Sequence, residues 1–379
     1  MAKKKRSHGE GSLYQRADGR WCAQLSVTLP SGQLVRRTVY GKTQRECREK
    51  LEQLKRELTA GVIGAPEKLT VGAYCQQWLD ANQSRLRPTT ARRYQQVLAC
   101  YIAPHLGGLP LSRLTPTVVE RWLHTLEDKG YAPRTLQQAR AVLRRALQDA
   151  LRDGLIARNA AALARPVSVP PPATSVWTVD EAQQFLRATR DHWLWPLFAL
   201  TLSLGLRQGE ALGLSWEDVD RERGMLLVRW QLQCVNGQWQ RLPPKSKQSR
   251  RALPLPPHAI AALEQQRLQQ QQWRAQPGWC GNPWNLVFTT HRGTPLSGRN
   301  VLRWFQQCCV AAGVPVIRFH DLRHATATFL LASGVDLKLV SSVLGHSQIS
   351  ITADFYTHVT TGLVAPALER LRDVFALPE

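Results

Sequence analysis

The sequence predicts a mainly α-helical protein with small antiparallel β-sheets, an α+β fold class. Apolar residues recur at helical spacing through most of the 379 residues. Short alternating stretches separated by turn residues occur near residues 10–40 and 225–255. The length is enough for two or three domains with their own cores. We therefore expect domains at 1–64, 65–165 and 176–379, with a linker at 166–175.

The first domain should be a small sheet with one helix. Strands are predicted at 12–15, 21–29 and 34–40, followed by a helix that begins at the capping box Thr43-x-x-Glu46. A basic tail precedes the sheet, and one sheet face is basic through Arg20, Arg36, Arg37 and Lys42. A three-stranded sheet of this size fits a DNA major groove. The alternative is a solvated face on a small oligomerisation module.

The second domain should be a four-helix module. Helices are predicted at 69–81, 89–103, 116–129 and 133–152, with prolines at helix starts and glycines at helix ends. Basic residues on the second and fourth helices are Arg92, Arg93, Arg134, Arg140, Arg144 and Arg145. The proline-rich stretch that follows should be stiff and extended rather than packed.

The third domain should combine helices with one small sheet. A capped helix begins after Thr178, and an apolar helix at 193–206 leads to Arg207. Strands at 225–233, 238–242 and 250–255 should pair as one antiparallel sheet, with Asn236-Gly237 at a hairpin. A polar helix at 258–273 and an irregular loop at 276–284 of unassigned role follow.

Composition narrows the class of protein. The formal net charge is +22, and basic residues are in excess in all three predicted domains, which favours a polyanion contacted along the whole molecule. The eight cysteines contain no C-x-x-C pair, which is typical of reduced thiols in a cytosolic protein. No apolar run approaches the ~18 residues of a membrane span. There is no nucleotide-binding glycine motif of the P-loop or G-x-G-x-x-G type.

The polar motifs of the third domain favour a phosphate-binding site. His320 and Arg323 stand three apart at the start of a predicted helix, so both can face one anion near the helix N-terminus. His320 and His324 have the spacing of zinc ligands, but no Glu follows His320 and no third ligand is evident. The full set of candidate residues in chain order is Arg207, Lys245, His320, Arg323, His346 and Tyr356.

This order of arginine, lysine, His-x-x-Arg, histidine and tyrosine resembles the tyrosine recombinase (phage integrase) family over residues 176–360. The resemblance implies an arm-type DNA-binding domain at 1–64, a helical core-binding domain at 65–165 and a catalytic domain with a C-terminal tail at 176–379. It implies a site-specific recombinase that cuts and rejoins DNA through a 3′-phosphotyrosine, for integration or excision of a phage or other mobile element. The implied partners are double-stranded DNA at core and arm-type sites, a homotetramer, and an accessory DNA-bending protein or excisionase. The implied protein is cytoplasmic at the nucleoid and uses no cofactor and no metal.

The chemistry assigns a role to each residue. Arg207, Arg323 and His346 supply donors to the non-bridging oxygens of the phosphate, and Tyr356 is the nucleophile. His320 should act as donor or acceptor near its ordinary pKa, and Lys245 should protonate the leaving 5′ oxygen. We expect the anions Glu210 and Asp321 to orient Arg207 and the pair of histidines, His320 and His324.

Two alternatives compete with a recombinase. A type IB topoisomerase has similar site chemistry, and a DNA-binding protein that has lost catalysis would keep the basic faces. The two front domains and the short tail favour recombination, and the complete residue set argues against lost catalysis. The tail stripe Leu368, Leu371, Val374 and Phe375 has helical spacing and must be buried somewhere. It can dock on its own domain or, as the resemblance favours, on a neighbouring protomer.

Overall fold

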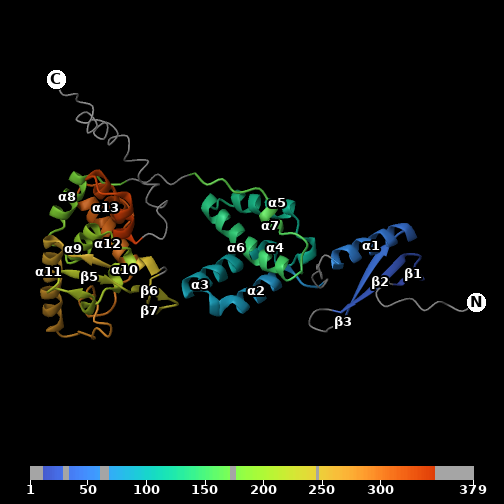
Figure 1. Cartoon of the computed structure of the whole chain (residues 1–379), viewed down its shortest axis with the longest axis horizontal. Helices are drawn as coiled ribbons and strands as arrows, with labels where there is room; N and C mark the ends of the chain where they lie inside the picture. Colours follow the sequence, from blue (N-terminus) through green and yellow to red (C-terminus); the bar gives the residue numbers. More distant parts are fainter. Residues whose placement is uncertain (1–11, 29–33, 60–67, 171–175, 245–246, 346–379) are drawn as a thin grey trace, which may run out of the picture. The chain divides into compact units, whose positions relative to one another are not determined.

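A computed structural model describes residues 12–28, 34–59, 68–170, 176–244 and 247–345 (Figure 1). The chain separates into two compact units, residues 1–171 and 172–379, and their boundary lies in the proline-rich segment. Each unit is described by itself. No helix among the described residues is both long enough and apolar enough to cross a membrane.

The first unit begins with a three-stranded antiparallel sheet and one helix. The sheet has the order β1 (Ser12–Gln15), β2 (Trp21–Thr28) and β3 (Leu34–Gly41), and α1 spans Gln44–Thr59. Their small core joins Ala23 and Leu25 of β2 to Cys47 and Leu51 of α1. Half of the predicted capping box forms, because the Glu46 N–H donates to Thr43 Oγ1, whereas the Glu46 carboxylate accepts from the N–H of Lys42, one residue before the N-cap.

The rest of the first unit is helical with a separate core. The helices are α2 (Val71–Asn82), α3 (Pro88–Val97), α4 (Ala103–Leu106), α5 (Pro116–Asp128), α6 (Pro133–Arg152) and α7 (Ala160–Leu163). A π-helical segment, Leu98–Ile102, joins α3 to α4 within the predicted second helix, and 3₁₀ turns lie at Gln83–Arg85 and Leu111–Arg113. Proline occupies the first turn of α3, α5 and α6, where its missing N–H costs nothing.

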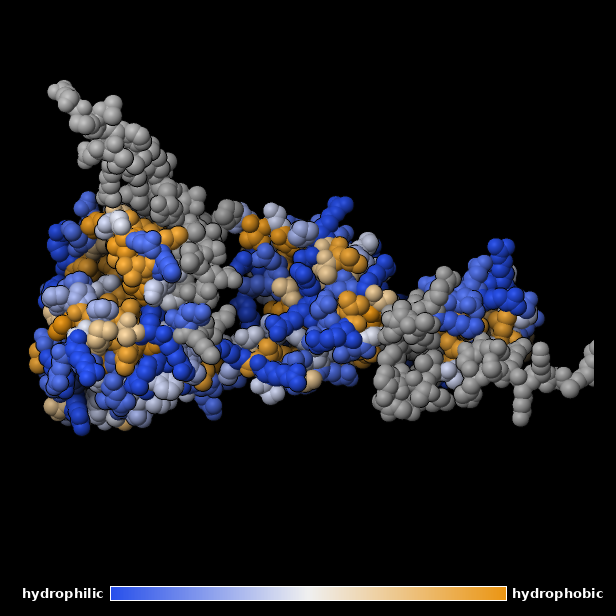
Figure 2. Space-filling model, viewed as in Figure 1, coloured by the Kyte–Doolittle hydropathy of each residue, from blue (hydrophilic) through white to orange (hydrophobic). Residues whose placement is uncertain are grey.

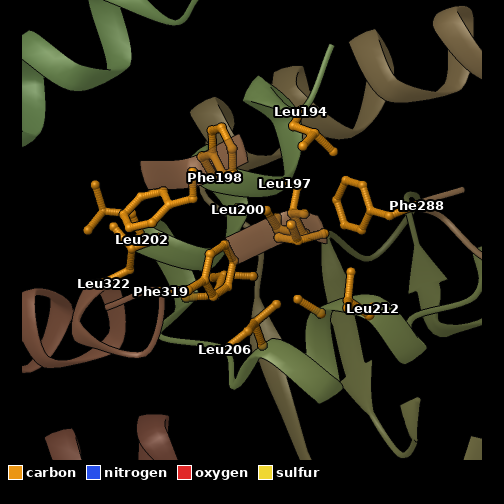
Figure 3. Packing of buried hydrophobic residues seen from close by; sticks show 14 of the residues in the cluster. Leu194, Leu197, Phe198, Leu200, Leu202, Leu206, Leu212, Phe288, Phe319 and Leu322 are labelled. Atoms are coloured by element: carbon orange, nitrogen blue, oxygen red, sulfur yellow. The ribbon is translucent and has the colours of Figure 1, made fainter. Parts of the chain in front are cut away.

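The second unit is built around α9 (Trp195–Leu204), which is buried on nearly all sides (Figure 3). Around it lie α8 (Val179–Ala188), α10 (Gln208–Gly213), α11 (Pro257–Arg274), α12 (Gly298–Ala311), α13 (Asp321–Ala332) and α14 (Leu337–Leu344). Phe198 and Leu200 of α9 share a core with Phe319 and Leu322 at the start of α13. The apolar helix that delivers Arg207 therefore also supports the start of the helix that carries Arg323.

The prediction of one sheet in this unit is wrong. The strands form two sheets, β4 (Val219–Asp220) with β5 (Met225–Val228) and β8 (Arg251–Pro254), and a separate hairpin of β6 (Gln231–Val235) and β7 (Gln238–Leu242). The predicted strand 225–233 is interrupted because Arg229 donates to the buried Asp218 carboxylate, and Trp230 lies under the Arg241 guanidinium. The hairpin turn is as predicted, since Asn236 and Gly237 both have positive φ.

The loop at 276–284 has a defined place. With Trp216 and the α11 residues Arg267 and Arg274 it lines a cavity of about 380 Å³. Trp279 of this loop lies against Gly293, where an added Cβ would come within 2.9 Å of the indole. The described candidates Arg207, His320 and Arg323 are not among the residues that line this cavity.

Candidate functional site

Three of the six candidate catalytic residues lie in the described part of the chain: Arg207, His320 and Arg323. Lys245, His346 and Tyr356 lie outside the described residues, as does the C-terminal tail. The description of the site therefore rests on α10, α13, α14, β8 and the segments that join them.

Arg207 is placed by a turn between α9 and α10. Gly205 has a left-handed conformation (φ 59°), and a Cβ there would collide with the side chain of Leu344. Arg207 is the residue that precedes α10, and the Glu210 carboxylate accepts from its backbone N–H at 3.1 Å and from its Nη1 at 2.6 Å. Burial alone would raise the pKa of Glu210, but the guanidinium groups of Arg251 and Arg207 lower it below its ordinary value. Glu210 is therefore an ionised anion that orients Arg207.

Arg323 lies in the first turn of α13 and is 1% exposed. Its Nη1 donates to the Gly205 carbonyl at 2.6 Å and its Nη2 to the Leu344 carbonyl at 2.5 Å. Burial lowers the pKa of Arg323 to about 9, with a further contribution from Arg207. The group remains mostly protonated at neutral pH, but its charge is held at a cost that a bound anion would relieve.

The C-terminal end of α14 is the point where three guanidinium groups meet, and we call these three residues the arginine cluster. The donors to the carbonyl oxygens of Val343, Leu344 and Gly345 are, in that order, Arg251, Arg323 and Arg207. The last carbonyls of a helix lack partners within the helix and carry partial negative charge, so cations stabilise them. Gly345 ends α14 in the left-handed conformation (φ 65°), which glycine adopts without strain.

His320 departs from the prediction that it titrates near its ordinary pKa, and that prediction is wrong. His320 is exposed to solvent, yet the protein around its ring partly desolvates it, and this desolvation is the main reason why its pKa falls to about 4. His324, Arg323 and Arg207 lower the pKa further. The His320 and His324 rings meet edge to face at 4.9 Å. His320 is thus a neutral hydrogen-bonding group at physiological pH rather than a cation.

Asp321 has a different main partner from the one expected. Its carboxylate accepts from the backbone N–H, Nε and Nη2 of Arg318 at 2.7–3.1 Å, and lies 3.8 Å from His324 Nε2. It therefore orients Arg318 closely and reaches His324, whereas the His320 ring is set by its place at the start of α13. No group of three or more His, Cys, Asp or Glu side chains within the described ranges is arranged to hold a metal ion.

Arg251 is the residue that the sequence interpretation left without a role. It belongs to the basic segment around Lys245, but in β8 it shares a face with Leu253, two residues on, which is buried. An arginine on the inward face of a predicted strand was the sequence signal that could have indicated a buried role for Arg251.

The predicted DNA contacts of the first unit fall into two groups. Arg92, Arg93, Arg134, Arg144 and Arg145 are exposed on α3 and α6. Arg140 is half-buried instead, and its Nη2 donates to the Ala164 carbonyl at 2.6 Å, so it ties α6 to the segment after α7.

In the front sheet, Arg36 and Lys42 are exposed and Arg20 pairs with Asp18 at 2.9 Å. The side chain of Arg37 lies outside the described residues.

Comparison with known proteins decides the family. Residues 176–362 match the phage integrase family, and residues 70–127 match the N-terminal SAM-like domain of phage integrases. A tyrosine recombinase XerC-like protein of Caldanaerobacter subterraneus subsp. tengcongensis is 31% identical over 99% of this chain and 100% of its own length. This chain belongs to the tyrosine recombinase (phage integrase) family. It is a site-specific DNA recombinase.

Other relatives of the recombinase agree with this assignment. An integrase of Streptomyces ambofaciens is 27% identical over 93% of both chains, and a putative prophage phiRv2 integrase of Mycobacterium tuberculosis is 28% identical over 93% of this chain and 92% of its own. The fold is shared with the Tn1549 transposon integrase in complex with circular intermediate DNA (TM-score 0.68, 21% identity, 80% of this chain and 100% of that chain). It is also shared with a lambda integrase tetramer bound to a Holliday junction (TM-score 0.58, 21% identity, 93% and 96%). The predicted fold class and family are confirmed.

Proposed function

We propose that Tyr356 is the nucleophile of this recombinase and that two members of the arginine cluster, Arg207 and Arg323, hold the scissile phosphate. The observation that carries the proposal is the meeting of Arg207 and Arg323 at the end of α14, one residue before His346. Two guanidinium groups from separate helices at one point suit a phosphodiester, whose charge grows on the non-bridging oxygens as it is attacked.

The described hydrogen bonds leave donors for DNA. A guanidinium has five N–H groups. The described bonds of Arg323 use two of them, and those of Arg207 go to Glu210, Ser249 and the Gly345 carbonyl. Among the described residues the remaining N–H groups of Arg207 and Arg323 have no partner, and we propose that they bind phosphate oxygens. His320, being neutral, can accept a proton from Tyr356 or donate a hydrogen bond to the phosphate without adding charge.

In the proposed reaction the phosphoryl group is transferred from the 5′ oxygen of the DNA to the Tyr356 oxygen. The Tyr356 oxygen forms a bond to phosphorus, the bond from phosphorus to the 5′ oxygen breaks, and Lys245 gives a proton to the leaving 5′ oxygen. His346 adds a donor to the phosphate. Rejoining is the reverse attack by a 5′-hydroxyl, so the energy of the broken bond is retained in the 3′-phosphotyrosine, and neither ATP nor a metal is needed.

The biological reaction that we propose is integration or excision of a mobile element. The relatives matched over nearly the whole chain are named as recombinases and integrases, which favours recombination over the topoisomerase alternative. The exposed arginines of α3 and α6 would contact the backbone of core-site DNA, and residues 1–64 would bind arm-type sites, with an accessory DNA-bending protein or excisionase as a further partner. The working assembly would be a homotetramer in the cytoplasm, at the nucleoid.

We propose an apolar groove of the second unit as the surface that receives the C-terminal tail of a neighbouring protomer. The groove has a volume of about 320 Å³ and is lined by residues of α8, α9, α11 and α13, among them Val179, Leu186 and Phe329. Apolar surface is visible over α8 and α13 in Figure 2. The stripe Leu368, Leu371, Val374 and Phe375 supplies the complementary apolar side chains.

Substitution of the nucleophile tests the proposed function. Tyr356→Phe removes only the hydroxyl, so DNA binding should persist while the covalent protein–DNA adduct disappears. The adduct is measured on a denaturing gel after reaction with nicked site DNA, in excess chelator and without ATP. An adduct of undiminished yield from Tyr356→Phe, or a wild-type adduct that needs added magnesium or zinc, would overturn the proposal.

A further inference from the structure

Arg251 is the member of the arginine cluster for which all three guanidinium nitrogens bond to described protein atoms. It starts β8, its partner across the sheet is the buried Val228, and its side chain is 7% exposed. Each arm of the guanidinium has a partner: Nε donates to the Val343 carbonyl at 2.6 Å, Nη1 to the Ser249 carbonyl at 3.1 Å and Nη2 to Glu210 Oε2 at 3.2 Å. The described guanidinium bonds of Arg207 and Arg323, by contrast, come from Nη1 and Nη2 only, so we place Arg251 apart from the proposed DNA contacts.

These bonds join three separate segments of the site. Glu210 belongs to α10 and holds Arg207, Ser249 belongs to the turn before β8, and Val343 belongs to the end of α14. The end of α14 also packs directly on this side chain, because a Cβ at Gly345 would come within 3.1 Å of Arg251 Nη1 and 2.9 Å of the Gln248 carbonyl oxygen. Arg251 therefore links β8, α10 and the end of α14 and helps to fix their relative positions.

The charges around Arg251 predict which way the Arg207 guanidinium would move if Arg251 were lost. Glu210 is shared between two cations, Arg207 at 2.6 Å and Arg251 at 3.2 Å. Without Arg251 the whole carboxylate is available to Arg207, whose guanidinium would be drawn toward α10 and away from the phosphate. The Val343 carbonyl would lose its donor at the same time, so the end of α14 would lose one of the three bonds that fix its position.

We infer that Arg251 is a positioning residue for strand cleavage, which holds the Glu210–Arg207 pair in register with the end of α14. The inference rests on the proposed function, since it assigns Arg207 to the scissile phosphate. It adds a residue that acts on the reaction without touching DNA.

The test compares Arg251→Met, Arg251→Lys and the matched control Arg241→Met in single-turnover cleavage of nicked site DNA. Arg241 is also a largely buried arginine of this unit, with its guanidinium on Asp218 and Ser215, but it lies outside the arginine cluster. A misplacement of about 1 Å at a reacting group can cost on the order of 10²-fold in rate. We expect Arg251→Met to slow cleavage by about that factor, Arg251→Lys to lie between it and wild type, and half-site DNA binding to be unchanged.

A change in the substrate separates positioning from a general loss of structure. A methylphosphonate at the cleavage site has a neutral group in place of one charged oxygen, so it depends less on a correctly placed guanidinium. The loss caused by Arg251→Met should shrink to less than about 10-fold on this substrate. Arg241→Met should show the same ratio to wild type on both substrates. If Arg251→Met does not fold, the comparison is made with Arg251→Lys. Its loss of cleavage rate relative to wild type should likewise be smaller on the methylphosphonate substrate.

Equal losses on the two substrates, or cleavage at the wild-type rate by both Arg251 variants, would overturn the inference. These outcomes are distinct from failure of the proposed function, which would show in the wild type as an adduct that does not depend on Tyr356.

Discussion

Glu210 is the carboxylate on which the positions of the half-buried Arg207 and the buried Arg251 depend, and its replacement by glutamine should be strongly destabilising. Its side chain is 3% exposed and accepts three hydrogen bonds, two from Arg207 and one from Arg251. Glu210→Gln keeps the shape but replaces one acceptor oxygen by an NH₂ group that must face an N–H donor. It also leaves the buried guanidinium of Arg251 and the half-buried guanidinium of Arg207 without their anion. Breaking a buried pair by removing one partner costs about 3–5 kcal/mol.

The matched control is Glu264→Gln. The Glu264–Arg221 pair has the same 2.6 Å separation as Glu210–Arg207, but both side chains are about half exposed. An exposed pair contributes about 0–1 kcal/mol, so this variant should unfold almost as the wild type does. The ion-pair distance alone would predict equal losses in the free energy of unfolding for the two variants, whereas the difference in burial predicts that the losses differ by several kcal/mol.

The assay is thermal unfolding of the full chain followed by calorimetry, so that the transition of the second unit is separated from that of the first. A loss of about 3–5 kcal/mol is a large part of the 5–15 kcal/mol typical of a domain and should lower the midpoint of that transition clearly relative to Glu264→Gln. If the two variants unfold at the same temperature, Glu210 is not the anion that stabilises the arginine cluster.

Two further predictions concern His320 and the tail. The pKa of His320 is about 4 in the folded protein and about 6.5 when unfolded, so the unfolded chain binds more protons between these values and stability falls as pH drops from about 6.5 to about 4. His320→Gln lacks this loss, so its melting temperature relative to wild type should be higher at pH 5 than at pH 7.5, and an unchanged difference would contradict the lowered pKa. Truncation after Thr361 should leave half-site binding unchanged and weaken tetramer assembly on full sites in native gels. Val179→Glu, at the 52% exposed rim of the apolar groove and in the first turn of α8 where an acid is favourable, should do the same, and wild-type assembly by either variant would exclude docking on a neighbour.

The sequence was most informative where the signal is local. The turn that carries Arg207, the stop of α14 at Gly345 and the hairpin at Asn236-Gly237 follow from the backbone freedom of glycine and asparagine. Pattern reasoning failed where a tertiary contact overrides the local preference. The predicted strand 225–233 reads as continuous because nothing in its own residues shows that Arg229 will reach Asp218. The lowered pKa of His320 could not be predicted from local sequence either, because it depends on desolvation and on charges that come from other segments.

Under the proposed function, the charges of the arginine cluster explain why the site needs its DNA. Arg207, Arg251 and Arg323 bring three positive charges, Glu210 returns one negative charge, and His320 is neutral, so these groups carry a surplus of two. The carbonyl oxygens at the end of α14 offset part of the surplus through their partial charges of roughly half an elementary charge in total. Burial is the main cause of the lowered pKa of Arg323, and the like charges of Arg207 and Arg251 lower it further against the opposing effect of Glu210. A phosphodiester has one negative charge, and the five-coordinate state that follows attack by a phenolate has two. The surplus therefore matches the transition state more closely than the bound substrate, and electrostatic stabilisation that increases along the reaction is what lowers the barrier.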